Sequence, residues 1–462
     1  MSGGGLFLNQ DKDIVIIGCG AGGVTVAQFA RKTDRKSTIT VFEQGAYPQY
    51  SKCGLPYAIS GKIPKIMDLV EFSEDWFKKI NIDIHLKTRV EKIDVKNKKI
   101  FAKKEGKTIE KAFGRLIICS GAKPFIPPIK NIDAQGVFAL RTIDDAKKIQ
   151  AYAKNAKNAT IIGAGLIGLE MADNLYSLGL KIAIVEALPN ILANNLDDDM
   201  AKLVVEKIPK KINVFTNHIA TKTENIDGKV SKITIKNKES GEEKTFDTDL
   251  VIIATGTKPN VELAKQIGCK IGSTGGIIVN NKSKTSIKNV YAVGDCTEYL
   301  NFVNVKPALV GLGSIVVRQG IAAGVNAAGG KYTLPRGLLM TSTSEFFGIE
   351  IASVGPTTNN LSDFSVLSAR FNGSSLPHYY PGGQPISIKI MVDEYTGMIM
   401  AVQAVGQNAA LRINTFACAI LGQMDIETFR KLETAYAPPI ATTLDATTLV
   451  CDMASMKLSR KN

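Results

Sequence analysis

The sequence contains few histidines, a single tryptophan and no long apolar run. Among its 462 residues are three histidines and one tryptophan. No stretch reaches the roughly 18 uninterrupted apolar residues of a transmembrane helix, so we expect no association with a membrane. Residues 1–8 lack a basic segment followed by an apolar one, so secretion is not expected. We therefore predict a cytoplasmic protein.

Cysteine is scarce and not clustered. Seven cysteines, an odd number, occur without the spacing of a metal site, so we expect reduced thiols and no metal ion. The 22% charged and 7% aromatic residues are typical of globular proteins and exclude a disordered, collagenous or coiled-coil chain. At roughly 100–200 residues per domain, the length allows about two to four domains.

Positive charge is in excess. A formal net charge of +14 is compatible with nucleic acid, an anionic membrane or acidic small molecules as partners. The densest basic segment, residues 87–111, also contains four acidic side chains, Glu91, Asp94, Glu105 and Glu110. Such mixed charges are typical of a lysine-rich solvated surface, so no nucleic-acid partner is expected.

One pattern of strand, glycine-rich loop, helix and strand occurs twice. The first copy lies at residues 13–17, 18–23, 24 to about 32 and 38–42. The second lies at residues 159–162, 163–168, 169 to about 178 and 181–185. Short apolar runs of this kind are typical of buried parallel strands. The repeat therefore predicts two βαβ units.

The pattern changes after about residue 331. Before that point, further apolar strands are predicted at residues 116–121 and 250–256, both ending in small residues, and at 290–293. Beyond it, alternating strands are predicted at 386–392 and 398–405, and amphipathic helices at 409–421 and 426–432. We predict an α/β fold class with two Rossmann-like domains and a C-terminal α+β domain.

Each glycine-rich loop has the context of a dinucleotide site. It lies between a strand and a helix, and an acidic residue follows about 20 residues later. The glycines permit a tight turn, a close approach to pyrophosphate and packing of helix against strand, and the acidic residue accepts hydrogen bonds from ribose hydroxyls. The predicted sets are Gly18, Gly20, Gly22, Gly23 and Glu43, and Gly163, Gly165, Gly168 and Glu186.

The residues after Glu186 favour NADH over NADPH. Ala187, Leu188 and Pro189 include no cation that could bind a 2′-phosphate. A basic residue from elsewhere in the fold could change this preference.

Cys53 is the candidate redox residue. It follows Lys52 and precedes a predicted turn into a helix, two features that favour the thiolate. A thiolate attacks disulfides and peroxides, whereas a buried structural cysteine is inert. No other cysteine lies nearby, so the centre is predicted to be a single thiol, which would form a mixed disulfide with a substrate thiol or a sulfenic acid with peroxide.

Together these features resemble the pyridine nucleotide–disulfide oxidoreductase superfamily over nearly the whole chain. Two further motifs carry the resemblance, Ala-Thr-Gly at 254–256 and Ala-Val-Gly-Asp at 292–295. The resemblance implies FAD in the first site and NAD(P)H in the second, with further cofactor contacts from Ser120, Gly121, Gly256, Gly294 and Asp295. It also implies an FAD-binding domain in two segments, an NAD(P)H-binding domain and a dimerisation domain, at residues 1–117 and 251–330, 118–250 and 331–462.

The C-terminal region is similar to coenzyme A disulfide reductases, within the single-cysteine branch of that superfamily. His-Tyr-Tyr-Pro-Gly at 378–382 and Tyr-Ala-Pro-Pro at 436–439 resemble the two tyrosine motifs of that group. The resemblance implies that Tyr380 and Tyr436 reach the cysteine site of the partner subunit in a homodimer. The alternative for Tyr436 is packing against the two prolines.

The same resemblance implies four further contacts. Arg31 and Lys32 match basic positions near the phosphates of coenzyme A, although both also suit an exposed helix C-terminus. Ser51 belongs to the pattern around Cys53, and we assign it to the substrate. Glu170 matches a position near the nicotinamide, with an ordinary surface helix residue as the alternative.

The predicted reaction is FAD-dependent reduction of coenzyme A disulfide, coenzyme A persulfide or polysulfide by NAD(P)H through Cys53. One alternative is an NADH oxidase or peroxidase that cycles Cys53 through a sulfenic acid. Those enzymes usually carry a histidine at the start of the first helix, and residues 21–25 contain none. A second alternative is a flavin-bound, redox-responsive binding protein.

Overall fold

The computed structural model describes residues 13–461. Residues 1–12, on which the expectation about secretion depends, and residue 462 lie outside the described residues. The chain divides into two compact units. Unit 1 comprises the chain up to Pro124, Thr257–Asn301 and Val305–Leu338, and unit 2 comprises Phe125–Gly256, Phe302–Asn304 and the chain from Leu339. The prediction of four segments in three domains stays a prediction.

Unit 1 contains a parallel sheet of five strands in the order β19-β7-β1-β2-β3. These strands are Val290–Ala292, Arg115–Ile118, Ile14–Ile17, Ile39–Phe42 and Asp83–His85. β1 lies between β2 and β7, and all its side chains are buried. Burial on both faces explains why the strand is a continuous apolar run rather than an alternating one.

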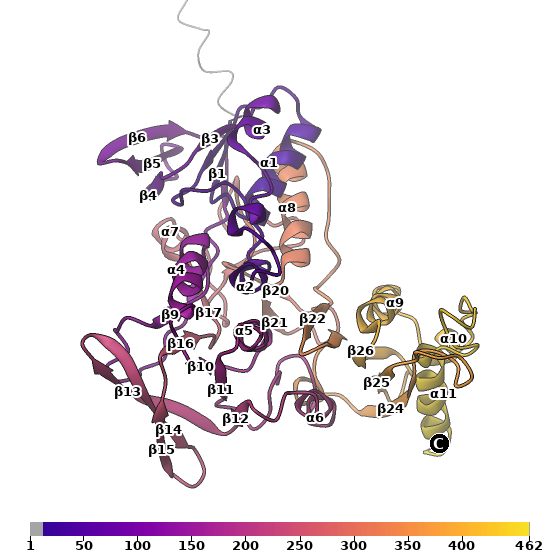
Figure 1. Ribbon diagram of the computed structural model, residues 1–462. Coiled ribbons are helices and arrows are strands. Elements are labelled where there is room, and N and C mark those ends of the chain that lie inside the picture. The colour runs from indigo at the N-terminus through magenta and orange to yellow at the C-terminus, as the bar shows by residue number, and fades with distance from the viewer. Residues whose placement is uncertain (1–12, 462) are drawn as a thin grey trace, which may run out of the picture. The chain divides into compact units, whose positions relative to one another are not determined.

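Two helices of unit 1 pack closely, α1 (Ala21–Thr33) and α8 (Gly313–Ala327), as Figure 1 shows. A Cβ atom at Gly320 would lie 2.8 Å from the Cβ of Thr25. One at Gly324 would lie 2.6 Å from the carbonyl oxygen of Val26. Glycine on α8 therefore permits this approach.

The other elements of unit 1 are short helices and small sheets. An antiparallel sheet, β4-β5-β6, lies beside β3 in Figure 1 and contains most of the basic segment 87–111. The helices are α2 (Leu55–Ile59), η2 (Ile66–Leu69, 3₁₀), α3 (Glu74–Lys79) and α7 (Glu262–Gln266). The strands are β4 (Arg89–Asp94), β5 (Lys99–Lys104), β6 (Lys107–Ala112), β8 (Ala122–Pro124), β17 (Thr257–Pro259), β18 (Ile277–Ile278), β20 (Thr297–Leu300) and β21 (Pro307–Leu309).

Unit 2 begins with a second parallel sheet of five strands in the order β12-β11-β10-β16-β9. These strands are Asn213–Phe215, Lys181–Val185, Asn158–Ile162, Leu250–Ile253 and Val137–Ala139, and the helices are α4 (Ile143–Ala153), α5 (Leu166–Ser177) and α6 (Asp198–Val205). An antiparallel meander of β13 (His218–Ile226), β14 (Lys229–Asn237) and β15 (Glu243–Asp247) interrupts it. The apolar runs and the glycine-rich repeat of the sequence do not predict this meander.

The C-terminal part of unit 2 is an antiparallel sheet covered by helices. The strand order is β22-β23-β26-β25-β24, at Ser342–Phe346, Ile349–Val354, Ile399–Gly406, Pro385–Asp393 and Val366–Ser374. The helical elements are η3 (Thr358–Leu361, 3₁₀), α9 (Ala409–Leu421), α10 (Ile426–Phe429) and α11 (Ala446–Ser459). Phe416, Val450 and Ile388 belong to one core that joins α9, α11 and β25.

The predictions for this region are confirmed in part. The strands at 386–392 and 398–405 and the helix at 409–421 are present, whereas α10 is shorter than predicted. α11 was not predicted, because threonine and cysteine fill buried positions of the helix in place of a clear apolar stripe. Among the described residues, no helix is long and apolar enough to span a membrane.

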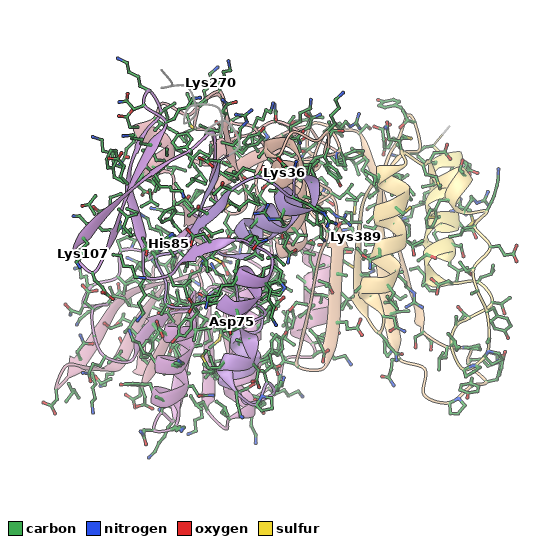
Figure 2. All side chains as sticks on the ribbon, turned by 90° about the horizontal axis from the view of Figure 1, so that it is seen from above. Lys36, Asp75, His85, Lys107, Lys270 and Lys389 are labelled. Atoms are coloured by element: carbon green, nitrogen blue, oxygen red, sulfur yellow. The ribbon has the colours of Figure 1, made fainter. Side chains whose placement is uncertain are left out.

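A partly buried ion network joins the two parts of unit 2. The ammonium of Lys389, which is labelled in Figure 2, lies 2.9 Å from Asp197 and 2.7 Å from Asp199. Arg370 lies 3.2 Å from the second carboxylate of this pair. The backbone N–H of Asp197 also donates to Gln403 at 2.8 Å. The start of α6 is thereby fixed to the C-terminal sheet.

Candidate functional site

The first glycine-rich loop connects β1 to α1 and is closed by backbone contacts. Gly18 has a φ of +102°, and a Cβ atom there would lie 2.2 Å from the Cys119 carbonyl oxygen. A Cβ atom at Gly23 would lie 2.0 Å from the Gly18 carbonyl oxygen, and one at Gly22 would lie 2.8 Å from Val293. Glycine is therefore required at these positions by the fold itself.

Gly20 differs from its neighbours. A Cβ atom at this position would meet no atom of the described residues within 4 Å. Gly20 is the N-cap of α1, and no side chain caps this end of the helix. The missing side chain leaves space in front of free N–H groups, which is what a pyrophosphate requires.

The second loop repeats the arrangement between β10 and α5. Gly163 has a φ of +103°, and a Cβ atom there would lie 2.4 Å from the Ala254 carbonyl oxygen. A Cβ atom at Gly168 would lie 2.0 Å from the Gly163 carbonyl oxygen, whereas one at Gly165 would meet nothing within 4 Å in the described chain. In both loops, some glycines are required by close backbone contacts and one leaves space at the start of the helix. Both loops therefore fit a dinucleotide.

The acidic residues of the two βαβ units form hydrogen bonds to the glycine-rich loops. The Glu43 carboxylate accepts hydrogen bonds from the N–H groups of Cys19 and Gly45, both at 2.7 Å. Glu186 accepts from Ala164 at 2.6 Å and from Leu188 at 2.8 Å. Each carboxylate therefore lies at the loop where a ribose would bind, and carboxylate oxygens retain further lone pairs for hydroxyl donors.

The other predicted contacts lie at strand ends. Ser120 and Gly121 follow β7, and the Ser120 hydroxyl donates to the Asn260 carbonyl at 2.6 Å. Gly294 follows β19 with a φ of +89°, and its N–H donates to the buried Gln319 side chain at 2.9 Å. Asp295 comes next and is half-buried. Gly256, in unit 2, has a φ of +98°.

Cys53 is exposed and lies in a turn that leads into α2, as predicted. The turn is anchored because the Ser51 N–H donates to the Leu69 carbonyl at 2.9 Å. A Cβ atom at Gly54 would lie 2.3 Å from Leu69, so glycine allows this contact. α2 has only five residues, so its contribution to thiolate stability is smaller than that of a long helix.

The remaining cysteines are mostly unsuitable as nucleophiles. Burial raises the pKa of five thiols, those of Cys19, Cys119, Cys269, Cys296 and Cys451. The other thiol, that of Cys418, is exposed on α9. Cys53 and Cys418 are therefore the accessible thiols of the described chain.

Arg31 and Lys32 lie in the last turn of α1. The Arg31 guanidinium donates to four backbone carbonyls, those of Ile80, Asp34, Arg35 and Asn81, at 2.6–3.3 Å. It thereby closes the C-terminus of α1. The Lys32 ammonium lies 4.6 Å from the centre of the Phe29 ring. Their role near coenzyme A phosphates stays a prediction, and Lys32 is the more available cation.

Glu170, on α5, is not an ordinary surface residue. Its carboxylate accepts a hydrogen bond from the Ser344 hydroxyl of β22 at 2.6 Å. Burial raises the pKa of the carboxyl, and the hydrogen bond from Ser344 opposes this rise. A perturbed carboxyl close to a dinucleotide loop is a candidate functional group.

Two exposed tyrosines meet in the C-terminal part of unit 2. The hydroxyl oxygens of Tyr379 and Tyr436 lie 2.6 Å apart. This hydrogen bond raises the pKa of the Tyr379 phenol. Sequence reasoning selected Tyr380, yet its neighbour Tyr379 forms the pair. No signal in the local sequence separates two adjacent tyrosines.

Sequence reasoning also missed Lys238. This residue follows β14, and its ammonium donates to the Ala187 carbonyl at 3.0 Å. Residues 187–189 contain no cation, but the ammonium of Lys238, about 50 residues later in the sequence, lies beside them.

Comparisons with protein families cover most of the chain. Residues 12–320 match the family model described as pyridine nucleotide-disulphide oxidoreductase. Residues 341–447 match the dimerisation domain of the same family.

Several known proteins are similar over nearly their whole length. A protein of Methanocaldococcus jannaschii named NADH oxidase is 38% identical over 97% of this chain and 99% of its own. The Pyrococcus furiosus protein named NAD(P)H sulfur oxidoreductase (CoA-dependent) is 35% identical over 94% of this chain and 97% of its own. The solved structure of a NAD-dependent persulfide reductase from A. fulgidus has a TM-score of 0.93 and 33% identity, covering 97% of this chain and 84% of that one.

Proposed function

The chain belongs to the pyridine nucleotide-disulphide oxidoreductase family, and from this premise we propose which sulfur chemistry it performs. The protein is a flavoprotein reductase that uses NAD(P)H to reduce coenzyme A disulfide, coenzyme A persulfide or a related polysulfide. The exposed thiol of Cys53 in the chain segment that follows the first dinucleotide loop is the observation that carries this assignment. The names of the relatives from Pyrococcus furiosus and A. fulgidus support it.

The residues that hold the cofactors follow from the two loops. The first loop, with Glu43, Ser120, Gly121, Gly294 and Asp295, would hold FAD. The second loop, with Glu170, Glu186 and Gly256, would hold NAD(P)H. When bound, FAD carries electron pairs from the nicotinamide to sulfur. The open positions at Gly20 and Gly165 support this assignment, because the side-chain space there is unoccupied by protein.

Cys53 performs the covalent step. Its thiolate attacks one sulfur of coenzyme A disulfide, the sulfur–sulfur bond breaks, and a mixed disulfide of Cys53 and coenzyme A forms. The first coenzyme A leaves as a thiolate and takes up a proton. Two electrons and one proton, which derive from NAD(P)H and solvent, then release the second coenzyme A as a thiol and restore the Cys53 thiolate.

Tyr436 supplies the proton for the leaving thiolate in this proposal, and Tyr379 supports it. A hydrogen bond from Tyr379 to the Tyr436 oxygen persists after Tyr436 gives up its proton, which favours the transfer. The dimerisation domain indicates a homodimer. We infer that the tyrosine pair serves the Cys53 of the partner subunit. Lys32 and Ser51 are the proposed contacts to coenzyme A, with Arg31 in a structural role.

The direct test is steady-state turnover of one preparation with coenzyme A disulfide, polysulfide, peroxide and oxygen. Replacing Cys53→Ser should abolish disulfide reduction while bleaching of the flavin by NAD(P)H continues. Cys418→Ser is the matched control, because it removes the other accessible thiol. Disulfide turnover that survives Cys53→Ser but not Cys418→Ser would overturn the assignment.

A second candidate function is oxygen or peroxide reduction, because the Methanocaldococcus jannaschii relative is named NADH oxidase. Such a reaction would oxidise Cys53 to a sulfenic acid, which dimedone traps. Release of coenzyme A from the protein by dithiothreitol, without dimedone labelling, favours the disulfide reaction. A large preference for oxygen or peroxide would establish the alternative.

A further inference from the structure

Lys238 lies at the second dinucleotide loop because three chain segments are joined by backbone hydrogen bonds. The N–H of His218 donates to the Glu186 carbonyl at 2.9 Å, and that of Asn217 donates to Leu188 at 3.0 Å. The N–H of Lys238 in turn donates to the Asn217 carbonyl at 2.8 Å. These bonds run from the end of β11, through the start of β13, to the end of β14.

The Lys238 side chain points back to the segment after β11. Its ammonium lies 3.0 Å from the Ala187 carbonyl oxygen, one residue beyond Glu186. That carbonyl is neutral, so the positive charge is not cancelled by this contact. The ammonium is exposed and can accept an anionic ligand.

Other charged and titratable groups lie on the strands that adjoin Lys238 and Glu186. The Lys244 ammonium of β15 lies over the Phe215 ring at 4.9 Å, and the His218 ring meets the same phenylalanine edge-on. The Glu186 carboxylate is occupied by the N–H groups of Ala164 and Leu188. These two hydrogen-bond partners of the carboxylate are both backbone groups.

In a βαβ dinucleotide site, the acidic residue at the end of the second strand lies at the adenosine ribose, and a nearby cation accommodates a 2′-phosphate. Glu186 alone would repel such a phosphate. We propose that Lys238 is the specificity-determining residue that binds the 2′-phosphate of NADPH. The enzyme then accepts NADPH as well as NADH, instead of the preference for NADH expected from residues 187–189. This inference rests on the proposed function in that NAD(P)H is the nucleotide of this loop.

The test measures binding of two nucleotide fragments to the flavin-loaded protein by titration calorimetry. Adenosine 2′,5′-bisphosphate and 5′-AMP differ only in the 2′-phosphate. Lys238→Ala should lower the affinity for the bisphosphate by roughly tenfold, as expected for the loss of one charge-assisted hydrogen bond. The affinity for 5′-AMP should be unchanged. Lys238→Arg should retain the affinity, because it keeps the charge.

Lys229→Ala is the matched control. It removes the same charge from the first residue of β14, at the other end of the strand from Lys238, which follows the last residue of β14. Wild-type affinity of Lys238→Ala for the bisphosphate would overturn the inference. An equal loss of affinity for both fragments would also overturn it, because such a loss indicates a structural role for Lys238.

The outcome is separable from that of the proposed function. Bleaching of the flavin by NADPH and by NADH is measured on the same variants, and Lys238→Ala should slow only the NADPH reaction at low nucleotide concentration. If neither nucleotide bleaches the flavin while the fragments still discriminate, the proposed reaction fails and the assignment of Lys238 stands.

Discussion

The hydroxyl oxygens of Tyr379 and Tyr436 lie 2.6 Å apart, although 57 residues separate the two tyrosines in the sequence. Both side chains remain exposed. A pair of phenols that is solvent-accessible and mutually hydrogen-bonded can donate a proton and keep the resulting phenolate hydrogen-bonded. The relationship identifies Tyr379, rather than Tyr380, as the partner of Tyr436.

Phenylalanine substitutions test this pair. Tyr436→Phe should lower turnover with coenzyme A disulfide by roughly 100-fold, within the usual range for loss of a general acid. Tyr379→Phe should lower it less, because Tyr436 remains, and Tyr380→Phe should have the smallest effect. Flavin bleaching by NAD(P)H should be unchanged in all three. A larger loss in Tyr380→Phe than in Tyr379→Phe would return the role to Tyr380.

Paired glycine substitutions separate cofactor binding from folding. Gly20→Ala adds a methyl group where the described chain has no neighbour within 4 Å, so the protein should fold normally but lose FAD. Gly23→Ala places its Cβ 2.0 Å from the Gly18 carbonyl oxygen and should destabilise the fold itself. Flavin absorbance and thermal unfolding of the apoprotein measure the two effects. Full flavin content in Gly20→Ala would contradict the assignment of the first loop.

The same comparison in the second loop concerns NAD(P)H. Gly165→Ala should retain FAD and stability but lose the rapid bleaching of the flavin by NAD(P)H, since Gly165 also lacks neighbours. Gly168→Ala is the destabilising counterpart, with its Cβ 2.0 Å from the Gly163 carbonyl oxygen. Normal bleaching in Gly165→Ala would show that the nucleotide binds elsewhere.

Local patterns predict much of this protein. The apolar strands, both glycine-rich loops and the turn at Cys53 are encoded by residues that are adjacent in sequence, so periodicity and glycine spacing reveal them. The contacts of Lys238 with Ala187, and of Ser344 with Glu170, connect segments about 50 and 170 residues apart. Such pairs depend on how the meander and the C-terminal sheet pack, which no local pattern specifies.

The same reasoning applies to Arg31 and Tyr380, whose roles in the site stay predictions. Arg31 matches a basic position by its place on α1, but the backbone carbonyls of Ile80 and Asn81, between α3 and β3, accept hydrogen bonds from its guanidinium. The choice between Tyr379 and Tyr380 depends on which side of the loop faces Tyr436. Both outcomes are set by tertiary packing rather than by the motif.

Glu170 should make stability depend on pH. Burial raises the pKa of its carboxyl in the folded protein above the unfolded value of about 4.3. Such a group favours the native state below the unfolded pKa, and this contribution is lost as the pH rises through the folded pKa, because the charged form is disfavoured in the native state. Glu170→Gln should therefore raise the melting temperature near pH 8, and the gain should disappear below about pH 4.

Ser344→Ala provides the complementary measurement. Loss of the hydroxyl removes a hydrogen bond that stabilises the charged carboxylate, so the pKa of Glu170 should rise further. If Glu170 acts at the nicotinamide, the pH profile of flavin bleaching should shift upward in Ser344→Ala and return in Ser344→Thr. A loss of stability without a shifted profile would assign Ser344 a purely structural role.

The ion network at Lys389 should contribute to the stability of unit 2. The Lys389 side chain is 12% exposed and that of Asp197 is 9% exposed, so removing the cation leaves the Asp197 carboxylate with little access to solvent, whereas Asp199 is 42% exposed. Lys389→Met should cost about 3 kcal/mol of unfolding free energy, the lower end of the range for removing one partner of a buried ion pair, because Asp199 keeps access to solvent. Denaturant unfolding measures this cost, and Lys123→Met, which breaks an exposed pair with Glu262, is the control.

The pH dependence of that network has the opposite sign from that of Glu170. Burial alone would raise the pKa of Asp197, but hydrogen bonds from Thr358 and Lys389 lower it below the ordinary value. A lowered folded pKa contributes stability that is present above the unfolded pKa of about 3.9 and is lost as the pH falls through the folded pKa. The difference in unfolding free energy between wild type and Lys389→Met should therefore become smaller at acidic pH. A difference that stays constant from neutral pH to about pH 2 would mean that Lys389 acts through packing rather than through charge.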